Sequence, residues 1–118
     1  MATTTPNNTG TAQLCAGMEI EYRAYKRLYD GGPAQILTLF ASFAYSETPH
    51  KVENYFTAVP GKEGEKYQLW QLIEGPANFI ASYYAASYSS QNGLPKLGDT
   101  VNIEDASGWH EVKVEQLD

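Results

Sequence analysis

The sequence predicts an all-β fold: an antiparallel sandwich or small barrel of six to seven strands. Three observations favour this class. Polar and apolar residues alternate over several segments, turn-forming residues separate these segments at short intervals, and two long stretches rich in Tyr, Phe and Ser carry no charge. Alternation with a period of two is the pattern of a half-buried strand. A series of such strands between turns is typical of sandwiches and barrels.

The length and composition predict one domain. The chain has 118 residues, of which 42% are hydrophobic and 19% charged, so one modest core can form. Residues 1–14 open with small polar residues and lack the basic and apolar regions of a secretory signal. We therefore expect a flexible tail over 1–14, a single domain over 15–118 and a cytoplasmic location. Export by a route without such a signal stays open.

The first strand is expected at 18–25, followed by a turn at 30–33. In the strand, apolar residues fall on one side and Glu19, Glu21 and Arg23 on the other. The turn contains two glycines followed by a proline, which is a strong break in regular structure.

Residues 35–46 and 77–90 fit either a strand or a helix. As helices they would begin near Pro33 and Pro76, and proline suits the first helical turn. A helix on a small domain usually presents charge to water, and neither segment contains any charge. We therefore favour strands. If both were helices, the chain would have an α+β, ferredoxin-like layout.

Two hairpins are expected in the remaining sequence. Residues 52–59 and 66–73 flank a loop that is rich in glycine and charge. Near the C-terminus, residues 100–103 and 111–114 alternate around the turn-forming residues of 105–108.

A self-similarity suggests an internal repeat. Tyr22–Leu28 resembles Tyr67–Ile73, and each is soon followed by Gly-Pro-Ala and then by an uncharged stretch. We predict two strand–turn–strand units at about 18–61 and 63–104. A unit that pairs with its own copy also suggests symmetric self-association, so we expect a homo-oligomer.

The charge balance argues against two classes of partner. Fourteen acidic and eight basic residues give a net charge of -6, and no basic cluster is present. Nucleic acids and anionic membranes attract positive surfaces, so we expect neither as a partner. The longest uncharged segment, 75–95, is rich in Tyr, Ser and Asn and is not a membrane span.

No motif in the sequence indicates catalysis or metal binding. His50 and His110 have no second His or Cys at ligand spacing, and the single cysteine, Cys15, cannot form an internal disulfide. Nucleophile and phosphate-binding motifs are absent, and no acid lies within an apolar run. We therefore expect no catalytic residues, no metal and no cofactor. A small enzyme remains the least favoured alternative.

Ligand recognition is the function that the composition favours. Segment 75–95 combines Tyr with Ser, Gly and Asn, as binding loops do, and flat aromatic rings suit the C–H faces of sugars. The candidate ligand-binding residues are Tyr25, Trp70, Asn78, Tyr84, Tyr88, Asn92 and Trp109. We rank a carbohydrate first, a protein second and a small apolar molecule inside a barrel third.

The same aromatic residues have a simpler interpretation. Each ring could belong to the core or to cross-strand pairs of the sheet. The uncharged segment 79–89 would also favour sheet extension between subunits if it lay at an edge, which would make the chain a self-assembling protein.

Overall fold

A computed structural model of the chain confirms the all-β class. It describes residues 11–28, 32–45, 48–78, 82–90, 93–94 and 97–117, although the side chains of 48–50 and 76–78 are not described. The strands are β1 (Ala12–Leu14), β2 (Met18–Leu28), β3 (Gln35–Tyr45), β4 (Thr48–Ala58), β5 (Lys66–Asn78), β6 (Ser82–Ser89), β7 (Thr100–Asp105) and β8 (Gly108–Gln116). The described residues form no helix, so the ferredoxin-like alternative is wrong. Accordingly, none of them forms a helix that could cross a membrane.

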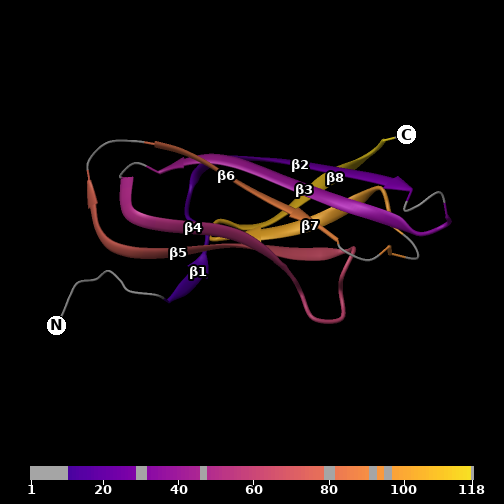
Figure 1. Cartoon of the computed structure of the whole chain (residues 1–118), viewed down its shortest axis with the longest axis horizontal. Helices are drawn as coiled ribbons and strands as arrows, with labels where there is room; N and C mark the ends of the chain where they lie inside the picture. The colour runs from indigo at the N-terminus through magenta and orange to yellow at the C-terminus, as the bar shows by residue number, and fades with distance from the viewer. Residues whose placement is uncertain are drawn as a thin grey trace.

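The strands form one curled sheet, a half-barrel. The hydrogen-bonded order is β1-β5-β7-β8-β2-β3-β6, and β4 pairs with the other edge of β5. Figure 1 shows two layers, with β2, β3 and β6 in one and β4, β5 and β7 in the other. Strands β4 and β6 approach each other across the open seam, where the described residues form no backbone ladder.

The C-terminal hairpin β7–β8 joins the two layers. Strand β8 runs parallel to β2, with Ala24 opposite Val114, and β7 runs parallel to β5, with Lys66 opposite Asn102. The antiparallel prediction is therefore correct for the hairpins and for β3 with β6, but not for these two pairings. A parallel pair needs a long connection between its strands, and β2 and β5 are both distant from the hairpin in sequence.

The core occupies the inside of the curl. Alternate residues of β3 point inward, as the strand interpretation of 35–46 predicts, and Leu37, Leu39 and Phe43 are buried. The largest fully buried side chains are Tyr67, Leu37, Leu39, Leu69, Ile103, Val101 and Cys15. The described interior is thus filled by side chains from both layers.

Two bulges alter the predicted strands. Gly75 and Pro76 lie within β5 and do not form the expected turn. The register shifts there, and Gly75 has a φ of 78°. Glycine adopts such a φ without steric cost, which allows an extra residue in the strand. In β2, Glu19 at φ 50° shifts the register after Met18, which consequently is exposed instead of sharing the inner side with Ile20.

The two predicted repeat units do not form the same pairings. Strands β2 and β3 pair as a hairpin, whereas β5 pairs with β4, β1 and β7, and β6 pairs with β3. The predicted tail also differs at its end, since Ala12–Leu14 form β1 opposite Leu72–Trp70 of β5.

Candidate functional site

The outer face of the β4–β5–β7–β8 layer carries both tryptophans. Trp109 is paired with Glu104, Glu104 with Gln68, and Gln68 with Thr57. Paired residues share one face of a sheet, as do residues two apart on a strand. Trp70 follows Gln68 by two residues and therefore lies on this face too. We call the set Thr57, Gln68, Trp70, Glu104 and Trp109 the tryptophan face.

Hydrogen bonds hold the polar groups of the tryptophan face in place. The amide of Gln68 donates to Oε1 of Glu104 over 2.8 Å, and the indole Nε1 of Trp70 donates to Oγ1 of Thr57 over 2.7 Å. Trp109 is 48% exposed, and Nζ of Lys66 lies 5.5 Å from the centroid of its ring. From standard strand spacings, the Cα atoms of Trp70 and Trp109 are about 12 Å apart. An amide and a carboxylate therefore lie between two indole rings.

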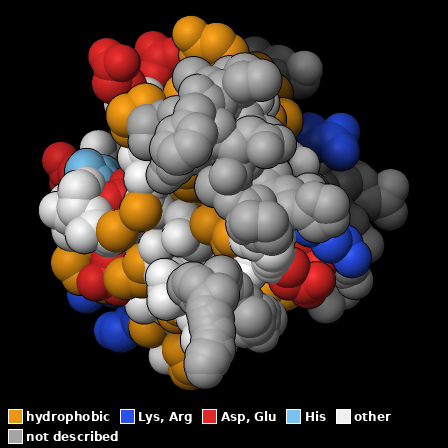
Figure 2. Space-filling model, turned by 90° about the vertical axis from the view of Figure 1, so that its left-hand side faces the viewer, with side chains coloured by type: hydrophobic (Ala, Val, Ile, Leu, Met, Phe, Trp, Pro, Cys, Tyr) orange, Lys and Arg blue, Asp and Glu red, His pale blue; other side chains and the backbone are white. Residues whose placement is uncertain are grey.

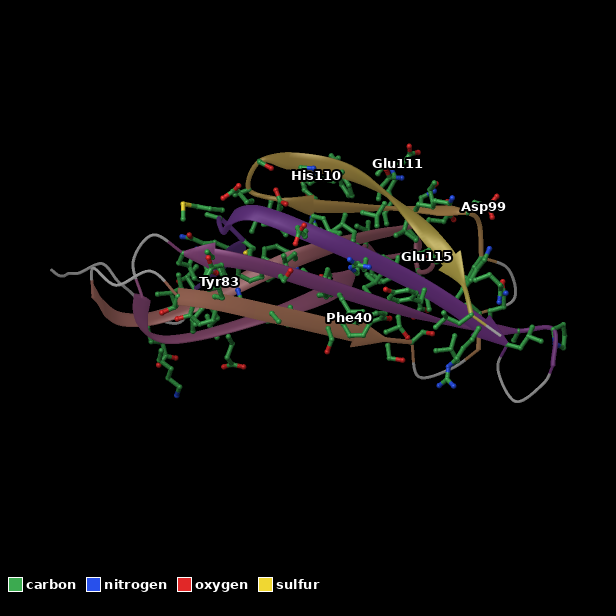
Figure 3. The ribbon with its side chains drawn as sticks, turned by 90° about the horizontal axis from the view of Figure 1, so that it is seen from above. Phe40, Tyr83, Asp99, His110, Glu111 and Glu115 are labelled. Carbon is green, nitrogen blue, oxygen red and sulfur yellow. The ribbon has the colours of Figure 1, made fainter. Side chains whose placement is uncertain are left out.

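The other layer presents a different outer face. We call Phe40, Ser42, Tyr83, Ala85 and Ser87, from β3 and β6, the tyrosine face. Tyr83 is 89% exposed and Phe40 is also exposed. Figure 3 shows these two aromatic residues on the β3–β6 side of the molecule, away from His110 and Glu111 of β8. These five side chains are uncharged, and the charged Arg23 and Glu21 of β2 lie next to Phe40 and Ser42 on the same side of the sheet.

Tyr25 lies beside the tyrosine face, at an open groove. Its ring meets that of Phe40 edge to face, with centroids 6.0 Å apart. The groove has a volume of about 330 Å³, and its other lining residues are Lys26, Arg27, Thr38 and Leu117. It could hold a small apolar group, but none of its lining side chains is buried.

Tyr84 and Tyr88 lie on the inner side of β6, not on the outer surface that their candidate role assumes. Tyr84 packs against Phe43 and Tyr45, with ring centroids 6.4 Å and 5.2 Å away. Tyr88 packs against Tyr67. Tyr83 and Tyr84 face opposite sides of β6, and the exposed residue of the two is Tyr83.

The structure does not describe the side chains of the two candidate asparagines. Asn78 is the last residue of β5 and its side chain is not described, while Asn92 lies outside the described residues. Of the five candidates whose side chains the structure describes, Trp70 and Trp109 are the two that share an outer face.

Asp105 is a buried acid that the sequence patterns did not identify. It follows Val101 and Ile103 on the inner side of β7, and that alternation could have revealed it. The hydroxyl of Tyr22 donates to its Oδ2 over 2.5 Å, and the Ser107 hydroxyl and amide donate to its Oδ1 over 2.6 and 2.8 Å. Burial raises the pKa of this carboxyl, but the hydrogen bonds from Ser107, Tyr22 and His110 outweigh it and lower the pKa.

Ser107, His110 and Asp105 are close together, but they do not form a nucleophile, base and orienting acid. Nε2 of His110 lies 2.9 Å from the Ser107 hydroxyl and 3.1 Å from Oδ1 of Asp105. In a catalytic triad the acid contacts the other ring nitrogen, so that Nε2 is free to accept the serine proton. Here the carboxylate itself takes the serine hydrogen bond. The cluster fixes the β7–β8 turn and links it to β2 through Tyr22.

A second polar cluster lies inside the half-barrel. The Tyr45 hydroxyl donates to Oε1 of Gln71 over 3.1 Å and accepts from Nδ2 of Asn54 over 2.9 Å. The backbone amide of Ala16 also donates to Gln71. Cys15 is buried beside Tyr45, as expected for an unreactive thiol, and burial raises its pKa. These bonds satisfy polar groups that would otherwise be costly to bury.

Comparisons with known proteins identify no relative. No family model matches the sequence, and neither a curated protein nor a solved structure gives a significant match. No group of three or more His, Cys, Asp or Glu side chains that could hold a metal ion occurs within the described part of the chain. The function must therefore be inferred from the surfaces themselves.

Proposed function

We propose that this protein is a non-enzymatic carbohydrate-binding module and that the tryptophan face is its binding surface. The observation that carries the proposal is the position of Trp70 and Trp109 on one sheet face, with Gln68 and Glu104 hydrogen-bonded between them. Indole rings offer flat apolar surfaces to the C–H faces of sugars. The amide of Gln68 can donate hydrogen bonds to sugar hydroxyl groups and accept them, and the carboxylate of Glu104 can accept them.

The arrangement favours an oligosaccharide over a single sugar. The two rings are about 12 Å apart, so one small ring cannot stack on both. Gln68 and Glu104 are already paired with each other, which fixes their positions before a ligand arrives. Lys66 lies over Trp109 and would move aside, which costs roughly 0.5–1 kcal/mol at an exposed site.

Trp109→Ala is the most direct test. The ring is exposed, so its removal should leave the fold unchanged and reduce binding to a glycan array at least tenfold. Trp70→Phe should weaken binding less, because a smaller ring remains while the hydrogen bond to Thr57 is lost. Melting temperatures of both variants separate loss of binding from loss of structure.

Tyr83→Ala provides the matched control. It removes an exposed aromatic ring from the opposite layer and should leave glycan binding unchanged. The proposal is wrong if the native protein binds no glycan on the array. It is also wrong if Trp109→Ala and Tyr83→Ala reduce binding equally.

A protein ligand is the second candidate. The observation that favours it is the tyrosine face, where exposed aromatic and small polar side chains occur without charge. Surfaces of this composition are typical of protein recognition.

A further inference from the structure

The two strands that border the seam of the half-barrel differ in a way that bears on self-association. Strand β4 contains Pro49, Lys51 and Glu53, and its register with β5 shifts between Pro49 and Lys51. Proline, charge and irregular register all discourage another strand from pairing with an edge. Strand β6, by contrast, contains no proline and no charge, and its register with β3 is regular over all eight residues.

The backbone of β6 has one edge that forms no ladder with another described strand, on the side of the seam where β4 approaches. The Ser90 amide donates to the Leu37 carbonyl over 3.0 Å, and in an antiparallel pair such bonds alternate along the strand. The peptide groups of Tyr84, Ala86 and Tyr88 therefore face β3. Those of Tyr83, Ala85, Ser87 and Ser89 face the other way, where no strand among the described residues pairs with them.

The side chains next to this edge are accessible as well. Tyr83, Ala85, Ser87 and Ser89 are all exposed. Figure 2 shows acidic and basic groups spread around one end of the molecule, between hydrophobic side chains. Since the chain carries a net charge of -6, two copies repel each other over much of their surface. Strand β6 lies in the long uncharged segment, where two copies can meet without opposing like charges.

We propose that β6 is a self-association edge and that its occupant is β6 of a second copy, paired antiparallel about a twofold axis at Ala86. In this register Ala85 lies opposite Ser87 of the partner subunit, and Tyr83 lies opposite Ser89 of the partner subunit. Each of these residues has its peptide group directed toward the partner. The sheet then continues from one copy into the other, and each exposed tyrosine gains a cross-strand neighbour in Ser89 of the partner subunit.

The interface is one strand wide, which determines its expected strength. Stable protein interfaces bury about 1,200–2,000 Å², more than a single pair of eight-residue strands provides. We therefore expect a reversible dimer with a dissociation constant in the micromolar range. Sedimentation velocity over a series of protein concentrations should show the sedimentation coefficient rising from the monomer to the dimer value.

Ala85→Lys tests the edge directly. The new side chain points to solvent in the monomer but lies close to its own copy across the twofold axis. It should weaken dimerisation at least tenfold and leave the monomer folded. Thr100→Lys is the matched control, because it adds the same charge at an exposed position on β7 and should not affect dimerisation. A dimer unaffected by Ala85→Lys, or a native protein that stays monomeric throughout, overturns the proposal.

Cysteine pairs test the register. The double variant A85C/S87C places two thiols of one copy opposite two of the other, with Cα atoms about 5.5 Å apart. It should oxidise to a covalent dimer, whereas Ala85→Cys alone should not, because residue 85 faces 87 of its partner. Equal crosslinking of the single and double variants would disprove this register. Trp109→Ala should dimerise as the native chain does, which separates this interface from glycan binding.

Discussion

Adjacent residues on one strand differ greatly in exposure and contacts, because one lies on the inner face of the sheet and the other on the outer face. Tyr83 is 89% exposed, while Tyr84 packs against Phe43 and Tyr45. Glu104 lies on the tryptophan face, while Asp105 is 2% exposed and receives several hydrogen bonds. One step along a strand therefore separates a residue that stabilises the fold from one that is free to contact a ligand. The following predictions test this difference.

The largest effect should come from alkaline pH. Burial raises the pKa of Tyr22, Tyr45 and Tyr67, and the nearby Asp105 carboxylate raises that of Tyr22 further. The folded protein therefore binds these protons more tightly than the unfolded chain does. The stability that they contribute is fully present below the unfolded pKa of about 10 and is lost as pH rises above it.

The measurement is a pH titration that follows tyrosinate absorbance and far-ultraviolet circular dichroism together. We expect the buried tyrosines to ionise only as the β signal disappears. Tyr83→Phe removes an exposed hydroxyl and should leave the unfolding midpoint unchanged. Complete ionisation of all tyrosines with the β signal intact would contradict the prediction.

Asp105→Ala should lower the free energy of unfolding by about 3 kcal/mol, because it leaves the hydrogen-bond donors of Tyr22 and Ser107 without their partner. Urea denaturation measures this loss. Asp99→Ala is the control, since that side chain is 95% exposed and its ion pair with Lys26 should contribute less than about 1 kcal/mol.

The pH dependence of the free energy of unfolding provides a sharper test of Asp105. Because the pKa of Asp105 is lowered in the folded protein, its contribution is present above the unfolded pKa of about 3.9. That contribution should be lost as pH falls through the folded value. The Asp105→Asn variant should lose less stability than the native protein as the pH falls. An equal loss of stability at acid pH in both proteins would argue against a stabilising role for the Asp105 carboxylate.

Tyr84→Ala and Tyr83→Ala compare the two faces at adjacent positions. The first should lower the free energy of unfolding by about 2 kcal/mol, because a half-buried ring leaves the core. The second should change it by less than about 0.5 kcal/mol. Thermal and urea denaturation of both variants measure the difference, and equal losses would contradict the inner and outer assignment.

Apart from the control variants, Gly17→Ala should have the smallest effect and lower the free energy of unfolding by about 1.5 kcal/mol through overpacking. An added Cβ would lie 2.4 Å from Cδ2 of Phe43, a buried ring with little room to move. Gly98→Ala is the control, because the nearest atoms to its added Cβ are 3.9 Å away. Similar melting temperatures for the two variants would show that Phe43 can shift aside.

The strands could be predicted from sequence because the inward residues alternate with polar ones. This holds for β3, where Leu37 and Leu39 identify the buried side. The bulge at Gly75 could not be predicted, since glycine before proline is also the pattern of a turn. Nor could the contacts of Tyr22 with Asp105, which depend on how the C-terminal hairpin enters the sheet.

The candidate site was predictable only in part. The aromatic residues could be recognised from composition, but which ring faces outward depends on strand register, as Tyr83 and Tyr84 show. Trp70 and Trp109 are far apart in sequence, and only the parallel pairing of β5 with β7 places them on one face. No local pattern specifies that pairing.

The placement of β7 and β8 between β5 and β2 has a consequence for biosynthesis. The sheet is continuous only through residues 100–116, which follow all the other described strands in the chain. Before this hairpin is made, no backbone ladder among the described strands joins the two layers. A nascent chain that has not reached residue 100 therefore has unpaired edges on β2 and β5, and such a chain would be prone to aggregation.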